Sequence, residues 1–244
     1  MQSLKSEIER IVSAEQPGPG VREIFLEFRD ALTRGEIRAA EKIDGDWRVN
    51  VWVKQGILLG FWLGELTQMG SGECLSFVDK DTFPARKFSV ADRVRMVPGG
   101  SSARLGAYIA PSVICMPPTF INVGAYVDEG TMIDSHALAG SCAQIGKRVH
   151  LSAAAQIGGV LEPVNACPVI IEDDVLSAGT AESTRVPLSG HAPCLELVSS
   201  SRAQLRFTIL YVAKFIGRAK KGRLRFRKVR LLFQALAQSI RGRR

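Results

Sequence analysis

The sequence predicts a mainly β protein, in which a parallel β-helix of hexapeptide repeats follows a small helical N-terminal domain and precedes an atypical basic C-terminal tail. Three observations support this prediction. An apolar residue recurs every six residues through the middle of the chain, the N-terminal part carries amphipathic helical patterns, and the C-terminal part carries basic residues without acidic ones. We therefore expect three regions, at 1–95, 96–176 and 177–244.

The six-residue period is the strongest of these signals. Apolar residues occupy Ile109, Cys115, Ile121, Val127, Ile133, Ala139, Ile145, Leu151 and Ile157, without a break in phase. In a parallel β-helix each hexapeptide supplies one short strand and one turn, and three hexapeptides make a triangular coil. Successive coils lie about 4.8 Å apart, so that these apolar residues stack inside. Residues 109–162 therefore predict three coils.

Two segments are expected to leave the coil. The stretch "MPPTF" (116–120) carries paired prolines, and "EPVNACP" (162–168) interrupts the phase. After the second segment the pattern restarts two residues out of phase, with Ile171 as the inward residue and Val175 in the small pocket.

The N-terminal region has the pattern of a compact, partly helical domain. Residues 2–15 and 21–32 predict amphipathic helices separated by "PGPG". The apolar stretch 47–64 predicts a buried element, which is either a helix or a strand.

The net charge of +8 belongs to the tail alone. The chain has 32 Lys and Arg and 24 Asp and Glu; residues 201–244 hold fourteen of the basic residues and none of the acidic ones. The remainder has eighteen basic and twenty-four acidic residues, a net charge of −6. Nucleic-acid binding by the main body therefore has no electrostatic support.

The five cysteines are scattered, odd in number and without a CxxC pair: Cys74, Cys115, Cys142, Cys167 and Cys194. This pattern is typical of reduced, buried thiols in a cytoplasmic protein and gives little support to a zinc site. No apolar run approaches the ~20 residues that a membrane-spanning helix needs, and the N-terminus lacks the apolar stretch of a signal peptide.

Several long motifs resemble one family. "GAYIAPSVICMPPTFINVGAYVDEGTMID", "GSCAQIGKRVHLS" and "IGGVLEP", together with "DWRVNVWVKQGILLGF" and "RVRMVPGGSSARLGAYIA", closely resemble the tetrahydrodipicolinate N-succinyltransferase family of lysine and diaminopimelate biosynthesis. The resemblance covers residues 1 to about 175. It implies a left-handed β-helix, a homotrimer with active sites between neighbouring subunits, no bound cofactor, and succinyl-CoA as the acyl co-substrate.

The resemblance also assigns two site residues. The family's substrate-binding arginine precedes "VP" by two residues and corresponds to Arg95, and a guanidinium suits a dicarboxylate acceptor. The family's functional aspartate corresponds to Asp134 in "IDSHA". A carboxylate there can orient the attacking amine and accept its proton, so we expect Asp134 both to bind the substrate and to act in catalysis. Asp128 has the same repeat phase, and spacing alone does not separate the two aspartates.

The chain departs from the family pattern in two places. Ser135 and His136 stand where the family has Thr-Trp. We expect His136 to be a polar, outward-facing residue, and we expect no metal site, because His136 and His150 occupy different phases of the repeat. Beyond residue 175 the resemblance ends, and Glu182 at the spacing of a second functional carboxylate has no matching surroundings.

The basic tail leaves the function open. The pattern of the tail is consistent with an amphipathic helix at a membrane surface or with a nucleic-acid-binding arm. The third interpretation, which we favour, is a non-homologous ending without an evolved role. The leading functional prediction is an N-succinyltransferase that acts on a small dicarboxylate. The alternatives are an inactive β-helical remnant or assembly module, and another hexapeptide acyltransferase.

Deletion of residues 202–244 should leave the body folded and move its isoelectric point to the acidic side, because fourteen positive charges leave with the tail. Circular dichroism and isoelectric focusing of the truncated chain would check this. Complete loss of the circular-dichroism signal would mean that the tail belongs to the core.

Overall fold

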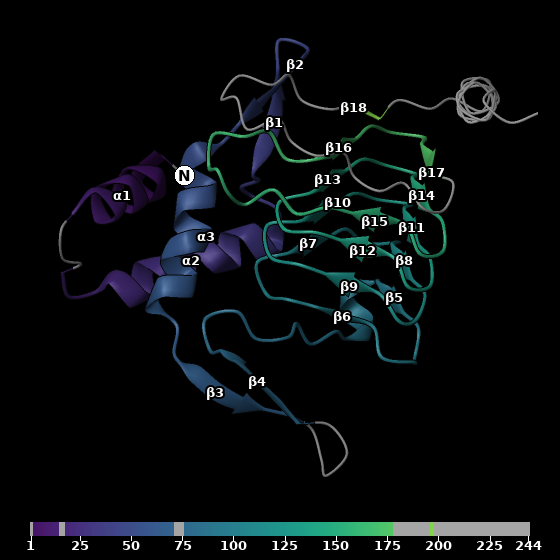
Figure 1. The fold of residues 1–244 in the computed structure, drawn as a ribbon, viewed down its shortest axis with the longest axis horizontal. Helices are drawn as coiled ribbons and strands as arrows, with labels where there is room; N and C mark the ends of the chain where they lie inside the picture. Colours follow the sequence, from purple (N-terminus) through teal and green to yellow (C-terminus); the bar gives the residue numbers. More distant parts are fainter. Residues whose placement is uncertain (1, 15–17, 71–75, 178–195, 198–244) are drawn as a thin grey trace, which may run out of the picture. The chain divides into compact units, whose positions relative to one another are not determined.

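The computed structural model describes residues 2–14, 18–70, 76–177 and 196–197. Within these ranges a helical N-terminal region leads into a stack of two-residue strands (Figure 1). None of the helices in the described ranges combines the length and the apolar character of a membrane span. The predicted tail, 177–244, lies outside the described residues except for residue 177 and strand β18 (Glu196–Leu197).

The first two helices confirm the amphipathic pattern. Helix α1 spans Gln2–Ser13 and helix α2 spans Val21–Arg34. Helix α2 ends at Gly35, whose φ of 74° is left-handed and whose backbone N–H donates to the carbonyls of the last turn. A glycine adopts this conformation without steric cost, which explains why the helix stops there.

The apolar stretch 47–64 contains both a strand and a helix. Strand β1 (Ala40–Ile43) pairs with strand β2 (Asp46–Val49), and helix α3 (Val51–Leu63) follows. Two glycines of α3, Gly56 and Gly60, let the helix approach its neighbours closely. A Cβ on Gly56 would meet the ring of Phe28, and a Cβ on Gly60 would meet the ring of Phe25. Helix α3 is therefore fitted to the aromatic core of α2.

An antiparallel hairpin and a short turn connect the helices to the β-helix. Strand β3 (Leu66–Met69) pairs with strand β4 (Phe77–Lys80). The 3-10 turn η1 (Val90–Asp92) then precedes the first strand of the stack.

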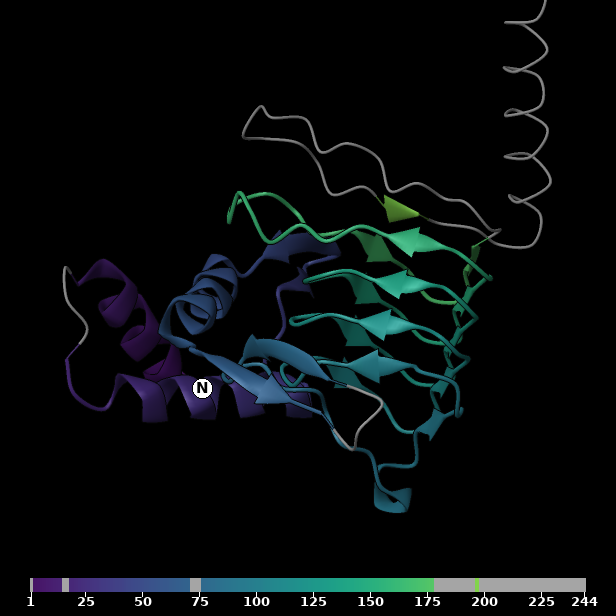
Figure 2. The same cartoon turned by 60° about the horizontal axis from the view of Figure 1, so that its bottom comes forward.

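The β-helix consists of two-residue strands joined by turns, and Figure 2 shows its coils stacked on one another. The strands are β5 (Arg95–Met96), β6 (Ser102–Ala103), β7 (Tyr108–Ile109), β8 (Ile114–Cys115), β9 (Phe120–Ile121), β10 (Tyr126–Val127), β11 (Met132–Ile133), β12 (Leu138–Ala139), β13 (Gln144–Ile145), β14 (His150–Leu151), β15 (Gln156–Ile157), β16 (Ile170–Ile171) and β17 (Leu176–Ser177). They form three parallel sheets: β5-β8-β11-β14-β17, β6-β9-β12-β15, and β7-β10-β13-β16-β18.

The register confirms the six-residue prediction. Val127 pairs with Ile145, and Ile133 pairs with Leu151, so that residues eighteen apart stack on each other. All nine predicted inward residues are buried and belong to one hydrophobic cluster. Strands β5 to β16 complete four coils, one more than predicted, because the stack already begins at Arg95.

One of the two expected excursions is wrong and the other is confirmed. The segment 116–120 stays in phase, because β8 and β9 follow each other at the regular spacing with the cis Pro117–Pro118 bond between them. The second excursion is present between β15 and β16. Ile145 pairs with Ile171, which is the predicted restart two residues out of phase.

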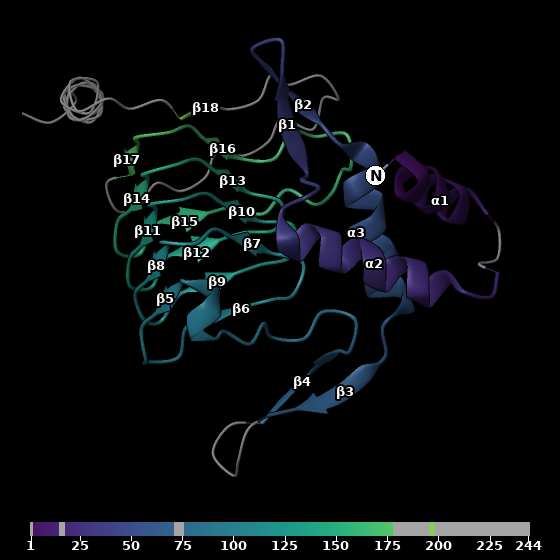
Figure 3. The same ribbon diagram turned by 180° about the vertical axis from the view of Figure 1, so that it is seen from behind.

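The N-terminal region and the β-helix share a second core. One buried cluster joins side chains of the helices (Phe25, Phe28 and Ile57) to side chains of the coils (Val123 and Cys142). Figure 3 shows α2 and α3 beside the stack.

A buried lysine also connects the two regions. The fully buried Lys54 of α3 donates from Nζ to the carbonyl of Ala166, in the segment between β15 and β16, at 2.5 Å. Burial lowers the pKa of the Lys54 ammonium.

The cysteines agree only in part with the prediction of reduced thiols. Cys115 and Cys142 are free and buried, and burial raises the pKa of both thiols to about 12. Cys167 is disulfide-bonded, so the prediction is wrong at this position. Cys74 and Cys194 lie outside the described residues.

The substitution Ile133→Asp should abolish soluble protein, because it would place a carboxylate inside the apolar stack at a cost of several kcal/mol. The matched control is Gln156→Asp, at an exposed outward position of β15. Soluble yield and thermal melting of both variants would check this, and a normal yield of Ile133→Asp would contradict the stacked core.

Candidate active site

One outer face of the β-helix carries the residues that the sequence assigned to a site. The sheet β5-β8-β11-β14 has Arg95, Ile114, Met132 and His150 in register, as successive first residues of their strands. The second residue of each strand points into the core, so this row points outward. The row therefore has a cationic side chain at one end and an imidazole at the other, with two apolar side chains between them.

The turn that precedes Arg95 is fixed by hydrogen bonds to Asp92. The carboxylate of Asp92 accepts hydrogen bonds from the Ser89 amide at 2.7 Å, the Ser89 hydroxyl at 2.8 Å and the Arg86 guanidinium at 3.0 Å. The Ser89 bonds and the Arg86 guanidinium lower the pKa of Asp92 to about 2. From this capped turn the chain enters β5, where the Arg95 amide donates to the carbonyl of Val113 at 2.9 Å. Arg95 itself is exposed.

Asp134 lies directly after β11, on the same face as Arg95. Its amide donates to the carbonyl of Leu151 at 2.9 Å, and its Oδ1 accepts the Ser135 amide at 2.7 Å. Its Oδ2 lies 3.7 Å from His150 Nε2, and 29% of the side chain is exposed. The carboxylate is therefore tied to the turn through one oxygen and directed outward through the other.

Arg95 and Asp134 share a face without touching each other. Among the described residues no hydrogen bond or ion pair joins them, since two strand spacings of about 4.8 Å separate β5 from β11. A substrate that contacts both residues of one chain would have to span these coils.

Asp128 has the same local geometry as Asp134 but lies at a different corner. Its amide donates to the carbonyl of Ile145 at 3.0 Å, and its Oδ1 accepts the Glu129 amide at 2.8 Å. However, it follows β10, which belongs to a different sheet from β5 and β11. Residues six apart fall on adjacent sheets of the triangle, so only Asp134 borders the sheet that contains Arg95. Spacing alone could not separate the two aspartates, but the coil geometry does.

His136 is exposed, as expected, and lies in the turn after Asp134. Its φ of 62° is left-handed, and its amide donates to the carbonyl of Pro118 at 2.6 Å. In the part of the chain that the structure describes, no three His, Cys, Asp or Glu side chains lie close enough to hold a metal ion.

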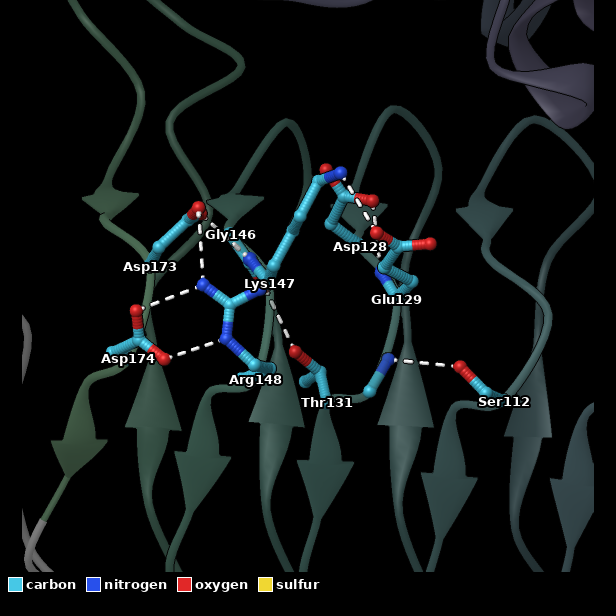
Figure 4. A network of polar contacts seen from close by, with 10 residues as sticks. Ser112, Asp128, Glu129, Thr131, Gly146, Lys147, Arg148, Asp173 and Asp174 are labelled. Atoms are coloured by element: carbon cyan, nitrogen blue, oxygen red, sulfur yellow. Dashed lines mark hydrogen bonds and ion pairs between the residues drawn. The ribbon is translucent and has the colours of Figure 1, made fainter.

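The corner beside Asp128 carries a network of charged residues that sequence reasoning missed (Figure 4). Lys147 donates to Glu129 at 2.8 Å, and the Arg148 guanidinium forms two bonds to Asp174 at 2.7 and 2.8 Å. These partners lower the pKa of Glu129 and of Asp174. Because the pairs are exposed to solvent, we interpret them as ties between successive coils with little net stabilisation.

A second group missed by sequence reasoning surrounds Arg38. Its guanidinium lies 3.7 Å from the centre of the Tyr126 ring and donates from Nε to Gln144 Oε1 at 2.9 Å. Burial lowers the pKa of Arg38. It borders a cavity of about 300 Å³ lined by Gln2, Lys5, Glu36, Ile37, Arg38, Glu41, Asn50 and Trp52. None of these lining residues belongs to the β5-β8-β11-β14 face that carries Arg95 and Asp134.

Comparisons with known proteins agree with the resemblance. The sequence profile of a family described as "Tetrahydrodipicolinate N-succinyltransferase N-terminal" matches residues 3–63. A 2,3,4,5-tetrahydropyridine-2,6-dicarboxylate N-succinyltransferase of Acinetobacter baylyi is 47% identical over 167 residues, which cover 66% of this chain and 60% of the relative. Enzymes of the same name from Parvibaculum lavamentivorans and Caulobacter vibrioides are 40% and 43% identical, over 81% of this chain and over 73% and 75% of the relatives.

The stacked coils of six-residue period define a hexapeptide-repeat β-helix protein. The Parvibaculum and Caulobacter enzymes are 40% and 43% identical to the chain over 73% and 75% of their own length. The chain therefore belongs to the tetrahydrodipicolinate N-succinyltransferase family. It spans only 60% of the length of the Acinetobacter relative.

The lowered pKa of Asp92, in the turn before β5, predicts that the stability of the fold depends on pH. Because the pKa of Asp92 is about 2 in the folded chain, below the ordinary value near 4, its carboxylate stabilises the fold fully above pH ~4. This contribution is lost as the pH falls from ~4 towards 2. The variant Asp92→Asn should therefore be less stable than the native chain at pH 6, and the two should converge towards pH 2. Urea unfolding at several pH values would check this, and a difference that stays constant down to pH 2 would contradict it.

Proposed function

We propose that the chain transfers a succinyl group from succinyl-CoA to the amino group of tetrahydrodipicolinate, in lysine and diaminopimelate biosynthesis. The observation that carries this proposal is its family membership, since relatives at 40% and 43% identity over 73% and 75% of their length bear the name of this activity. Succinyl-CoA enters as a co-substrate, and no resident cofactor is needed for the transfer.

Arg95 is proposed to bind a carboxylate of the acceptor. An exposed guanidinium on a rigid strand offers paired, charge-assisted hydrogen bonds to a carboxylate. It also has no ion-pair partner among the described residues. Its charge therefore remains available to a dicarboxylate substrate.

Asp134 is proposed to orient the acceptor amine and to take its proton. Because the acceptor is a cyclic imine without an N–H bond, water first adds to its C=N bond to give an amine. The amine nitrogen then forms a bond to the thioester carbonyl carbon, the C–S bond breaks, and the proton that leaves the nitrogen passes through the carboxylate to the departing thiolate. The partly exposed carboxylate of Asp134, with Oδ2 free of the turn hydrogen bond, suits this role.

A homotrimer in the cytoplasm is part of the same proposal. Arg95 and Asp134 lie on an outer face rather than in an enclosed cavity of one chain. A neighbouring copy that covers this face would exclude water and supply the remaining walls of the site. Sedimentation of the purified chain would test the assembly.

The rival proposal is a β-helical protein without transferase activity. It is favoured by the divergence of the sequence after about residue 175, where the family motifs end and a basic segment without acidic residues follows at 201–244. Release of thiol from succinyl-CoA, measured with and without tetrahydrodipicolinate, separates the proposals. Acceptor-dependent release supports the succinyltransferase, a different preferred acceptor indicates another acyltransferase, and no release with any acceptor supports the inactive protein.

Asp134→Asn should remove most succinyl transfer, by about 10²–10⁴-fold, because the amide keeps the size of the side chain but accepts no proton. Asp128→Asn is the matched control, since the two aspartates make the same turn hydrogen bonds at different corners. Initial rates of both variants would check this. Equal losses would show that both residues are turn residues only.

A further inference from the structure

His150 carries a polar atom that the fold leaves without a partner. It is the outward residue of β14, and its neighbours in the sheet are Met132 on β11 and Leu176 on β17. Although 42% of the side chain is exposed, Nε2 is shielded from solvent and has no hydrogen bond within the described part of the chain. A shielded nitrogen without a partner is costly and therefore points to an interaction that this conformation does not complete.

The unpartnered nitrogen faces Asp134. His150 Nε2 lies 3.7 Å from Asp134 Oδ2. The register enforces this approach, because Met132 pairs with His150 and the Asp134 amide donates to the carbonyl of Leu151. Asp134 Oδ1 already accepts the Ser135 amide, so Oδ2 is the oxygen that remains for the imidazole.

Asp128 provides a comparison for the contact between Asp134 and His150. It makes the same turn hydrogen bond as Asp134, through Oδ1 to the next amide in the chain. The residue that stacks over Asp128 one coil later is Gly146, and the residue two positions before Gly146 is Gln144. Gln144 donates to the carbonyls of Cys142 and Ala143. The imidazole facing Asp134 is therefore a feature of this corner and not of the repeat.

We propose that His150 is a positioning residue for Asp134. A small rotation brings Nε2–H onto Oδ2, so that the carboxylate is held through both oxygens with its remaining lone pairs directed outward. This inference rests on the proposed function, in which Asp134 takes the proton of the attacking amine. His150 does not touch the substrate and exchanges no proton with it; it holds the carboxylate in the orientation that the transfer needs.

The alternative role for His150 is to fill space between Met132 and Leu176. Three variants separate the two roles. The amide nitrogen of His150→Gln reaches the place of Nε2, that of His150→Asn reaches only the place of Nδ1, and His150→Phe keeps a ring without a nitrogen. A positioning role requires a donor at the place of Nε2, whereas a filling role requires only the ring.

The first experiment is independent of activity. The chain has three histidines, so few imidazole N–H signals compete in proton NMR of the full-length protein. We expect a downfield, exchange-protected Nε2–H signal in the native chain that is absent from both His150→Gln and Asp134→Ala. Absence of this signal from the folded native chain, or its persistence in Asp134→Ala, would overturn the proposal.

The second experiment measures steady-state succinyl transfer. We expect His150→Phe and His150→Asn to lower kcat by up to ~10²-fold with little change in KM for succinyl-CoA, and His150→Gln to recover a large part of the loss. A His150→Phe variant as active as the native chain would overturn the positioning role. If the native chain itself transfers no succinyl group, the proposed function fails, and the NMR experiment alone decides the place of His150.

Discussion

The main-chain pairing between residues one coil apart is the constraint on which the rest of this structure depends. Because Val127 lies over Ile109 and under Ile145, the chain has no freedom to choose which side chains face outward. Pairing at about 4.8 Å per coil satisfies the hydrogen-bonding groups of the backbone, and the same pairing stacks the inward residues on one another. The outer rows follow from the same register, so that Arg95, Met132 and His150 fall on one line although they are far apart in sequence.

This constraint also explains which parts of the fold could be predicted from the sequence. The period of six is visible because every inward position must be apolar, and it located the restart at Ile171 correctly. The paired prolines at 117 and 118 wrongly indicated a segment that leaves the coil, because a corner of the triangle accommodates them without extra residues. The stretch 47–64 was ambiguous because apolar content alone does not separate a strand from a buried helix. The disulfide at Cys167 has no local sequence signal.

The candidate site was predictable only with the help of family motifs. Repeat phase placed Asp128 and Asp134 in equivalent turns, and the resemblance selected one of them. The structure adds a physical distinction, since only Asp134 borders the sheet of Arg95 and faces an imidazole. The stacking of Arg38 on Tyr126 and the ion pairs of Lys147 and Arg148 join residues through tertiary contacts, for which no sequence period exists.

The buried ammonium of Lys54 has a consequence for how the chain holds together. A buried ammonium is costly unless it is hydrogen-bonded, so movement of the segment between β15 and β16 away from helix α3 would remove the bond that Lys54 makes to the carbonyl of Ala166. The aromatic core links the same two regions, because Phe25 of helix α2 and Cys142 of the coils belong to one buried cluster. We therefore expect the N-terminal region and the β-helix to unfold together rather than as two independently melting modules.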